Sequence, residues 1–180
     1  IPAVAPAGKL KEHTEPFIRR IDEFKPESIT RLDNGNLLIK APEMITGWAK
    51  IRINAPENEQ VTILYGEKLT DDGHVLTVGG NQGRDGHWWP LDFIQKDRFI
   101  SDGSPALFEP KFSYKGFLYI EIENHAESLT ADDITLYRIA NDVEISGSFD
   151  CSDELVNQLH SLMRRTLLNN FQWKPTDTPV

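Results

Sequence analysis

Residues 28–39 read Ser-Ile-Thr-Arg-Leu-Asp-Asn-Gly-Asn-Leu-Leu-Ile, two β-prone runs around an Asn-Gly pair. Asn34 and Gly35 both accept a positive φ, so their position predicts a β-hairpin with a type I′ turn. The alternation continues at 48–53, which predicts a strand with two unlike faces. The expected faces are Trp48, Lys50 and Arg52 against Ala49, Ile51 and Ile53.

Further short runs with alternating or β-branched residues follow, separated by turn signals. They lie at 61–67, 97–100, 107–112, 117–122, 134–139 and 145–149. No helical period separates these runs, so the sequence predicts an all-β domain, a jelly-roll-type antiparallel β-sandwich. Between Gly79 and Pro90 the strand pattern stops, and a long irregular loop is expected.

The last part of the chain predicts one C-terminal α-helix. Asp150 and Ser152 are candidate N-caps, and the helix is expected to reach about Asn170, before Pro175. Apolar residues recur at helical spacing and continue past that end: Leu155, Leu159, Leu162, Met163, Leu167, Leu168, Phe171 and Trp173. So much apolar surface predicts a connector that packs partly on a following domain.

These patterns divide the chain into three parts. Residues 1–15, which begin Ile-Pro-Ala-Val-Ala-Pro, are interpreted as a linker from an upstream domain. Residues 16–149 form the predicted sandwich, and 150–180 the connector helix with the start of a further domain.

Composition excludes some classes of partner. The formal net charge is −9 at pH 7, which argues against a nucleic acid, since phosphate binding needs a basic face, and against an anionic membrane surface. Cys151 is the single cysteine, so an intrachain disulfide is impossible and the compartment is left open. No apolar run approaches the roughly 20 residues that cross a bilayer.

No catalytic, metal or cofactor site is predicted from motifs. The histidines lack metal-ligand spacing, and no phosphate-binding glycine loop opens a helix. One local feature suggests binding: Trp88 and Trp89 could stack on the apolar faces of a sugar, with Asp85 and His87 bonding its hydroxyls. The alternative is that one tryptophan closes the end of the sandwich and the other contacts a neighbouring domain.

Several stretches, in order along nearly the whole chain, resemble the bacterial α-L-rhamnosidases. The similar stretches are Thr46-Gly47-Trp48, Leu64-Tyr65-Gly66-Glu67-Lys68-Leu69, Asp72-Gly73, Gln95-Lys96-Asp97-Arg98-Phe99-Ile100, residues 108–120 (Phe-Glu-Pro-Lys-Phe-Ser-Tyr-Lys-Gly-Phe-Leu-Tyr-Ile), Gly147-Ser148-Phe149-Asp150-Cys151-Ser152-Asp153, Asn169-Asn170 and Thr176-Asp177-Thr178-Pro179. The resemblance is to the concanavalin-like β-sandwich before the catalytic domain and to the connector that follows it.

This resemblance implies a multidomain inverting glycoside hydrolase that removes terminal α-L-rhamnose. Its partner for this chain would be a catalytic (α/α)₆ barrel of the same protein. Asp177 matches the first residue of a family motif and would contact the sugar, whereas the general acid of that motif and the base would lie beyond Val180. Inverting hydrolysis needs both carboxylates, so the chain alone is expected to be inactive.

Three hypotheses remain from the sequence. The chain is a scaffold for the barrel, or a carbohydrate-binding module acting through the Trp88-Trp89 loop, or a small enzyme with an unrecognised carboxylate pair.

Overall fold

The computed structural model describes residues 7–9, 11–77, 80–82, 88–90, 94–125 and 127–176, with the backbone alone at 80–82 and 88–90. Its elements, in chain order, are β1 (Ile18–Phe24), β2 (Ser28–Arg31), β3 (Leu37–Ile53), β4 (Gln60–Gly66), β5 (Gly80–Gln82), β6 (Trp88–Pro90), β7 (Lys96–Ile100), β8 (Ala106–Phe108), β9 (Lys115–Glu123), the 3₁₀ turn η1 (Ala131–Asp133), β10 (Ile134–Asn141), α1 (Glu154–Asn170), β11 (Phe171–Gln172) and β12 (Lys174–Pro175).

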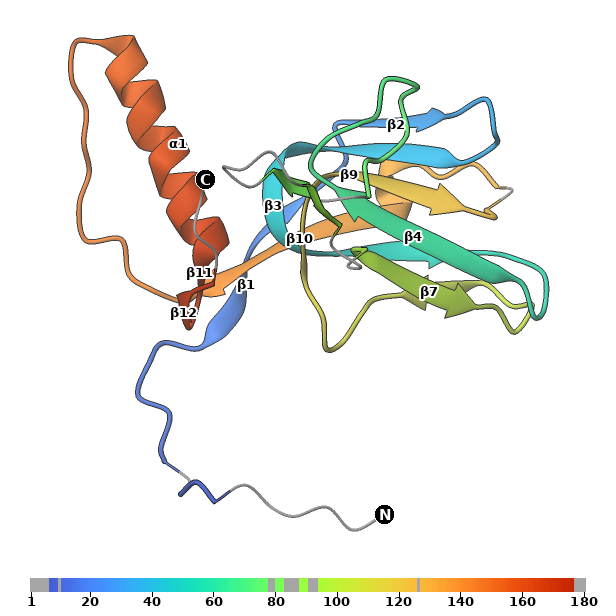
Figure 1. Ribbon diagram of the computed structural model, residues 1–180, viewed down its shortest axis with the longest axis horizontal. Coiled ribbons are helices and arrows are strands. Elements are labelled where there is room, and N and C mark those ends of the chain that lie inside the picture. The colour runs from blue at the N-terminus through green and yellow to red at the C-terminus, as the bar shows by residue number, and fades with distance from the viewer. Residues whose placement is uncertain are drawn as a thin grey trace.

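Eight strands form one antiparallel sheet that curls into two layers (Figure 1). Its main path runs β1-β10-β3-β9-β4-β7, with β2 and β8 also paired to β3. β3 bends, and its pairing with β9 is interrupted between Lys40 and Ile45. Its first part pairs with β2 and β9, and its last part with β10 and β8. The predicted all-β sandwich followed by a C-terminal helix is therefore confirmed, in the form of one curled sheet.

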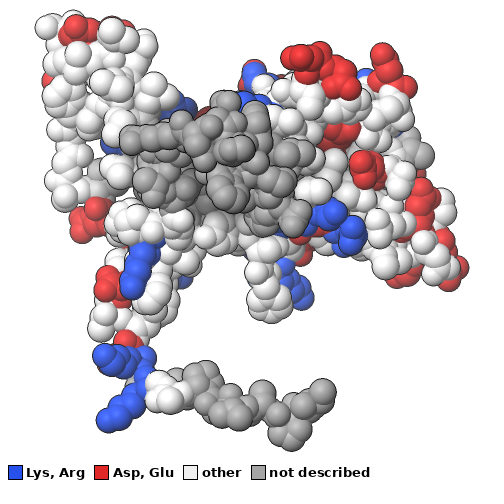
Figure 2. Space-filling view, in the orientation of Figure 1, with Lys and Arg blue, Asp and Glu red and all other residues white. Residues whose placement is uncertain are grey.

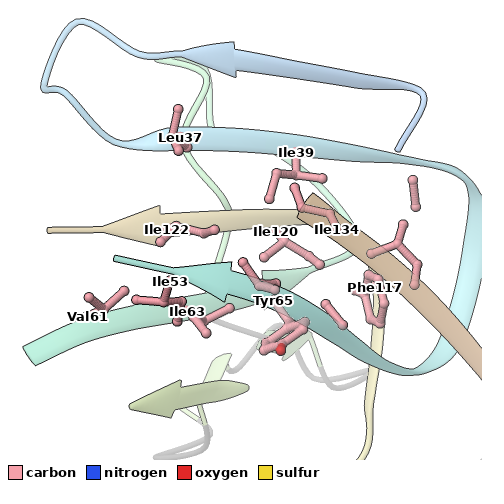
Figure 3. Close-up of a cluster of buried hydrophobic side chains, with 14 of the residues drawn as sticks. Leu37, Ile39, Ile53, Val61, Ile63, Tyr65, Phe117, Ile120, Ile122 and Ile134 are labelled. Atoms are coloured by element: carbon pink, nitrogen blue, oxygen red, sulfur yellow. The ribbon is translucent and has the colours of Figure 1, made fainter. Parts of the chain in front are cut away.

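The apolar core lies between the two layers (Figure 3). Its largest fully buried side chains include Tyr65 and Phe117, whose rings meet edge to face at 5.3 Å. As predicted, Ala49, Ile51 and Ile53 point into this core. Burying a side chain of this size contributes on the order of 1.5–3 kcal/mol, so the core is the main source of stability.

The first hairpin forms where predicted, but its turn differs. Leu32 N donates to Asn36 O at 2.8 Å and Gly35 N donates to Leu32 O at 2.9 Å. Gly35 has a φ of 88°, whereas Asn34 is not among the described residues with positive φ. A type I′ turn needs positive φ at both positions, so that expectation was wrong. The turn is a three-residue loop that ends in a left-handed glycine.

Two strand predictions also need correction. The runs at 37–39 and 48–53 belong to one strand, because the residues between them remain extended. Pro42, which lacks an N–H, lies in the interruption of the β9 pairing. The strand expected at 145–149 is absent from the described structure: the sheet ends at Asn141, and the chain then leads away to α1, with Ile145 exposed (Figure 1).

Helix α1 ends at Asn170, as predicted, but its N-cap is neither Asp150 nor Ser152. The side chain of Asp153 accepts a hydrogen bond from Leu155 N at 2.9 Å. All three residues are good caps, and Asp153 is the one that directly precedes the helix and bonds an amide of its first turn. Past the helix, β11 and β12 pair around Trp173, which has a φ of 72°.

The close approach of β3 and β10 depends on Gly47. A Cβ at this position would lie 1.9 Å from Tyr137 O. We expect Gly47→Ala to lower the free energy of unfolding by at least about 1–3 kcal/mol, the usual cost of overpacking. Urea denaturation followed by tryptophan fluorescence measures this change. Gly147→Ala is the control, since its Cβ would meet nothing within 4 Å; equal stabilities of the two variants would contradict the prediction.

Candidate functional site

The structure brings Trp88 and Trp89 into a short β-ladder. In the pairing of β5 with β6, Asn81 lies opposite Trp89 and Gln82 opposite Trp88. The loop expected from Gly79 to Pro90 is thus regular at 80–82 and 88–90, which corrects that expectation. The other predicted site residues, Asp85, His87 and Asp177, lie outside the described residues.

The segment before this ladder is held to the sheet by a buried carboxylate, Glu121 of β9. Glu121 is 2% exposed and accepts hydrogen bonds from His74 Nδ1 and Val75 N, both at 2.8 Å. It also accepts one from Asn36 Nδ2 at 2.7 Å. One side chain therefore fixes both the β2–β3 hairpin and the chain that leaves β4.

The contact between Glu121 and His74 shifts the pKa values of both side chains. Burial raises the pKa of the Glu121 carboxyl, but its three hydrogen-bond donors outweigh that effect and leave the pKa below the ordinary 4.5. The hydrogen bond to Glu121 raises the pKa of His74 above the ordinary 6.5.

The segment after the ladder is held by Gln95. The side-chain amide of Gln95 donates to Gly116 O at 3.0 Å and accepts from Gly116 N at 2.8 Å. The backbone carbonyl of Gln95 accepts from Tyr65 N at 2.9 Å. Next to it, the ammonium of Lys115 lies 2.5 and 2.6 Å from the two carboxylate oxygens of Asp97. Tyr65 donates to the same carboxylate at 3.1 Å. Burial, followed by the Asp97 charge, raises the pKa of Tyr65 well above 10. The chain thus enters and leaves the Trp88-Trp89 segment at fixed points.

A hollow of about 420 Å³ lies between β1 and the chain after β8. Trp48 Nε1 donates to Glu109 Oε1 at 2.8 Å, and Arg20 pairs with the same oxygen. The Arg20 guanidinium also lies 5.4 Å from the Trp48 ring centre and 4.3 Å from that of Tyr137. These polar groups satisfy one another, so none of them requires a ligand.

The face of α1 turned to solvent is apolar. None of its 17 residues, all described, is buried, and Leu155, Leu159, Leu162, Met163 and Leu167 are each more than half exposed. Figure 2 shows the visible side of α1 as largely uncharged, whereas acidic residues gather over the opposite end of the sheet. A patch of this kind on a folded domain marks an interaction surface.

Polar contacts attach the C-terminal third of α1 to the sheet. We name the residues that make these contacts the α1 joint: Glu43, Met44, Thr46, Arg138, Arg165 and Asn169. Glu43 of β3 pairs with Arg138 of β10 and, at 2.6 Å, with Arg165 of α1. Arg138 also donates to Asp22 at 2.7 Å. Asn169 donates to Met44 O at 3.1 Å and accepts from Thr46 N at 3.3 Å.

Sequence reasoning did not find the α1 joint, although β10 carries a signal for it. Arg138 falls in phase with the core-facing residues Ile134 and Leu136, and its side chain is only 5% exposed. A cation in that phase needs anionic partners, but the sequence does not identify which carboxylates supply them.

Comparisons with known proteins agree with this architecture. Residues 30–140 match the family model described as the bacterial alpha-L-rhamnosidase concanavalin-like domain. The chain belongs to this family. Residues 144–180 match the model of the bacterial alpha-L-rhamnosidase 6 hairpin glycosidase domain. The resemblance seen in the sequence is thereby confirmed.

Individual relatives cover most of this chain. An alpha-L-rhamnosidase of Formosa agariphila is 29% identical over 91% of the chain and 17% of its own length. The solved alpha-L-rhamnosidase of Dictyoglumus thermophilum is 29% identical, with a TM-score of 0.84 over 99% of this chain and 19% of that one. That of Aspergillus terreus has 26% identity and a TM-score of 0.74 over 91% and 18%. The chain therefore spans under a fifth of these relatives.

The described residues contain neither a metal-ligand cluster nor a membrane-spanning helix. No group of three or more potential ligands among His, Cys, Asp and Glu could hold a metal ion there. In the same residues, no helix has the length and apolarity of a membrane span.

Removing the Glu121 charge should loosen the segment that leads to the Trp88-Trp89 ladder. We expect Glu121→Gln to speed hydrogen exchange at the Val75 amide about tenfold, because a buried charge-assisted hydrogen bond contributes about 1.5–3 kcal/mol. Glu123→Gln is the matched control, since Glu123 lies on the same strand and has no hydrogen-bonded or charged partner among the described residues. Equal exchange in both variants would count against this role.

The stabilisation that the Glu121–His74 hydrogen bond provides should depend on pH. The stabilisation from Glu121 is present above pH 4.5 and is lost as the pH falls through its lowered pKa. The stabilisation from His74 is present below pH 6.5 and is lost as the pH rises through its raised pKa. The difference in the free energy of unfolding between the wild type and Glu121→Gln, measured by urea denaturation, should therefore be greatest between pH 4.5 and pH 6.5.

Proposed function

We propose that this chain is the non-catalytic β-sandwich domain of a larger α-L-rhamnosidase, and that it serves as a scaffold for a catalytic (α/α)₆ barrel. One observation carries the proposal: α1 is attached to the sandwich by polar contacts and leaves an apolar face exposed. Residues 144–180, which include α1, match the glycosidase-domain model, and this supports the barrel as the domain that covers that face.

The reaction proposed for the whole protein is inverting hydrolysis of terminal α-L-rhamnosyl linkages. Inversion places a general acid and a general base on opposite sides of the scissile bond. The motif that supplies the acid in the family is represented here by Asp177-Thr178-Pro179 alone. In this proposal Asp177 contacts the sugar, and both catalytic carboxylates come from polypeptide that follows this chain.

The test compares this chain with the longer natural polypeptide that contains it. We expect the longer protein to hydrolyse an aryl α-L-rhamnoside, and this chain to release no product above the blank. A dye specific for exposed apolar surface should bind this chain and lose most of that binding in the longer protein, because the barrel covers α1. Hydrolysis by the chain alone, or a longer protein inactive on rhamnosides, would refute the proposal.

The alternative function is sugar binding through Trp88 and Trp89. The anchoring of the residues that flank their segment, Val75 at Glu121 and Gln95 at Gly116, favours it, because fixed ends reduce the entropy that the segment loses on binding. Carbohydrate would then be a direct ligand of this domain.

Two variants separate the alternatives in the longer protein. If the segment is a scaffold, Trp88→Ala and Trp89→Ala should lower the melting temperature and leave KM for the rhamnoside unchanged. If it binds sugar, both variants should raise KM at unchanged melting temperature and weaken L-rhamnose binding in calorimetry.

A further inference from the structure

The direction in which α1 leaves the sheet has an identifiable cause. In Figure 1, α1 approaches the sheet only at the end next to β11, and the rest of the helix rises away from it. No residue of α1 is buried, and Leu168 is half-buried, so apolar packing alone does not account for the direction of the helix. The polar contacts near its C-terminal end supply the remaining restraint.

We infer that Glu43 and Asn169 are positioning residues that together fix the orientation of α1 on the sandwich. Glu43 uses its two carboxylate oxygens for two different arginines, Arg138 of the sheet and Arg165 of the helix. Arg138 is itself immobilised, since it is buried, pairs with Asp22 and lies over the ring of Phe24 at 5.0 Å. The charge that Arg165 meets is therefore at a fixed point of the sheet.

Asn169 makes directional hydrogen bonds that restrict the angle of α1, which an ion pair alone does not do. β10 pairs with β3 only from Gly47 onward, so Met44 O and Thr46 N lie beyond the end of that ladder. The Asn169 amide donates to Met44 O and accepts from Thr46 N, as a neighbouring strand would, and Arg138 also donates to Met44 O at 3.3 Å. Two hydrogen bonds on one planar amide, together with the Arg165 pair one helical turn away, define both position and angle.

The contacts of the α1 joint cross the boundary between the two family matches. Glu43, Met44 and Thr46 lie within 30–140, whereas Arg165 and Asn169 lie within 144–180. If the proposed function holds, the joint sets how the barrel sits on the sandwich. The orientation of α1 itself is a property of this chain and is tested without that assumption.

The experiment measures the distance between spin labels on α1 and on the sandwich. Gln158→Cys and Asp132→Cys, both exposed, carry the labels in a Cys151→Ser background. We expect a narrow distance distribution in this background and a broad one after Arg165→Gln or Asn169→Ala. Arg164→Gln and Asn170→Ala are the matched controls: Arg164 has no ion-pair partner among the described residues, and Asn170 donates its side-chain amide only within α1.

Urea denaturation of each variant shows that the sheet stays folded, so a broad distribution reports α1 alone. Glu43→Gln keeps an oxygen for one arginine, and the double variant Glu43→Gln/Arg165→Gln should broaden the distribution no more than Arg165→Gln alone. Distributions as narrow in Arg165→Gln and Asn169→Ala as in their controls would overturn the inference. An inactive longer protein would refute the proposed function and leave this result unaffected.

Discussion

Because β3 takes part in both layers, the layers cannot separate unless a strand of 17 residues breaks. Its bend closes the sheet on the core. The pairing with β9 is interrupted before Ile45 and then resumes, and the pairing with β10 begins only at Gly47. Backbone groups at Met44 and Thr46 are thereby left for a side chain to satisfy, and Asn169 satisfies them. The feature that encloses the core therefore also creates the attachment point of α1.

Buried charges occur where chain segments leave the sheet. Glu121 holds the segment after β4, the Lys115–Asp97 pair lies beside the segment before β7, and Arg138 lies at the attachment of α1. A buried ion pair adds little net stability compared with apolar residues, but losing one partner is costly. Apolar burial accordingly stabilises this domain, and the charged groups determine where its loops and its helix begin.

The sequence predicted the features that depend on local pattern. Alternation identified the two faces of 48–53, and helical spacing with Pro175 identified the end of α1, because both depend on neighbouring residues alone. The strand expected at 145–149 failed for the opposite reason. A strand needs a partner edge, and only the folded sheet, which ends at Asn141, decides whether such an edge is present.

The candidate site was less predictable for the same reason. Aromatic composition drew attention to Trp88 and Trp89, but the groups that hold their segment come from distant positions, such as Asn36 and Glu121. The α1 joint likewise combines residues more than a hundred positions apart. Of these residues, Arg138 alone is indicated by the sequence, because its charge falls in phase with the core-facing residues of β10.

Attachment of α1 through polar contacts leaves its apolar surface available to a second domain. Arg165 and Asn169 are four residues apart and share one side of the helix, whereas Leu159 and Met163 lie on another. If the apolar side packed on the sandwich instead, burying it would remove the surface that a following domain could use. The two sides of the helix thus differ: directional hydrogen bonds and ion pairs hold one side on the sandwich, and the exposed apolar side could bind a following domain by non-directional burial, as the proposed function requires.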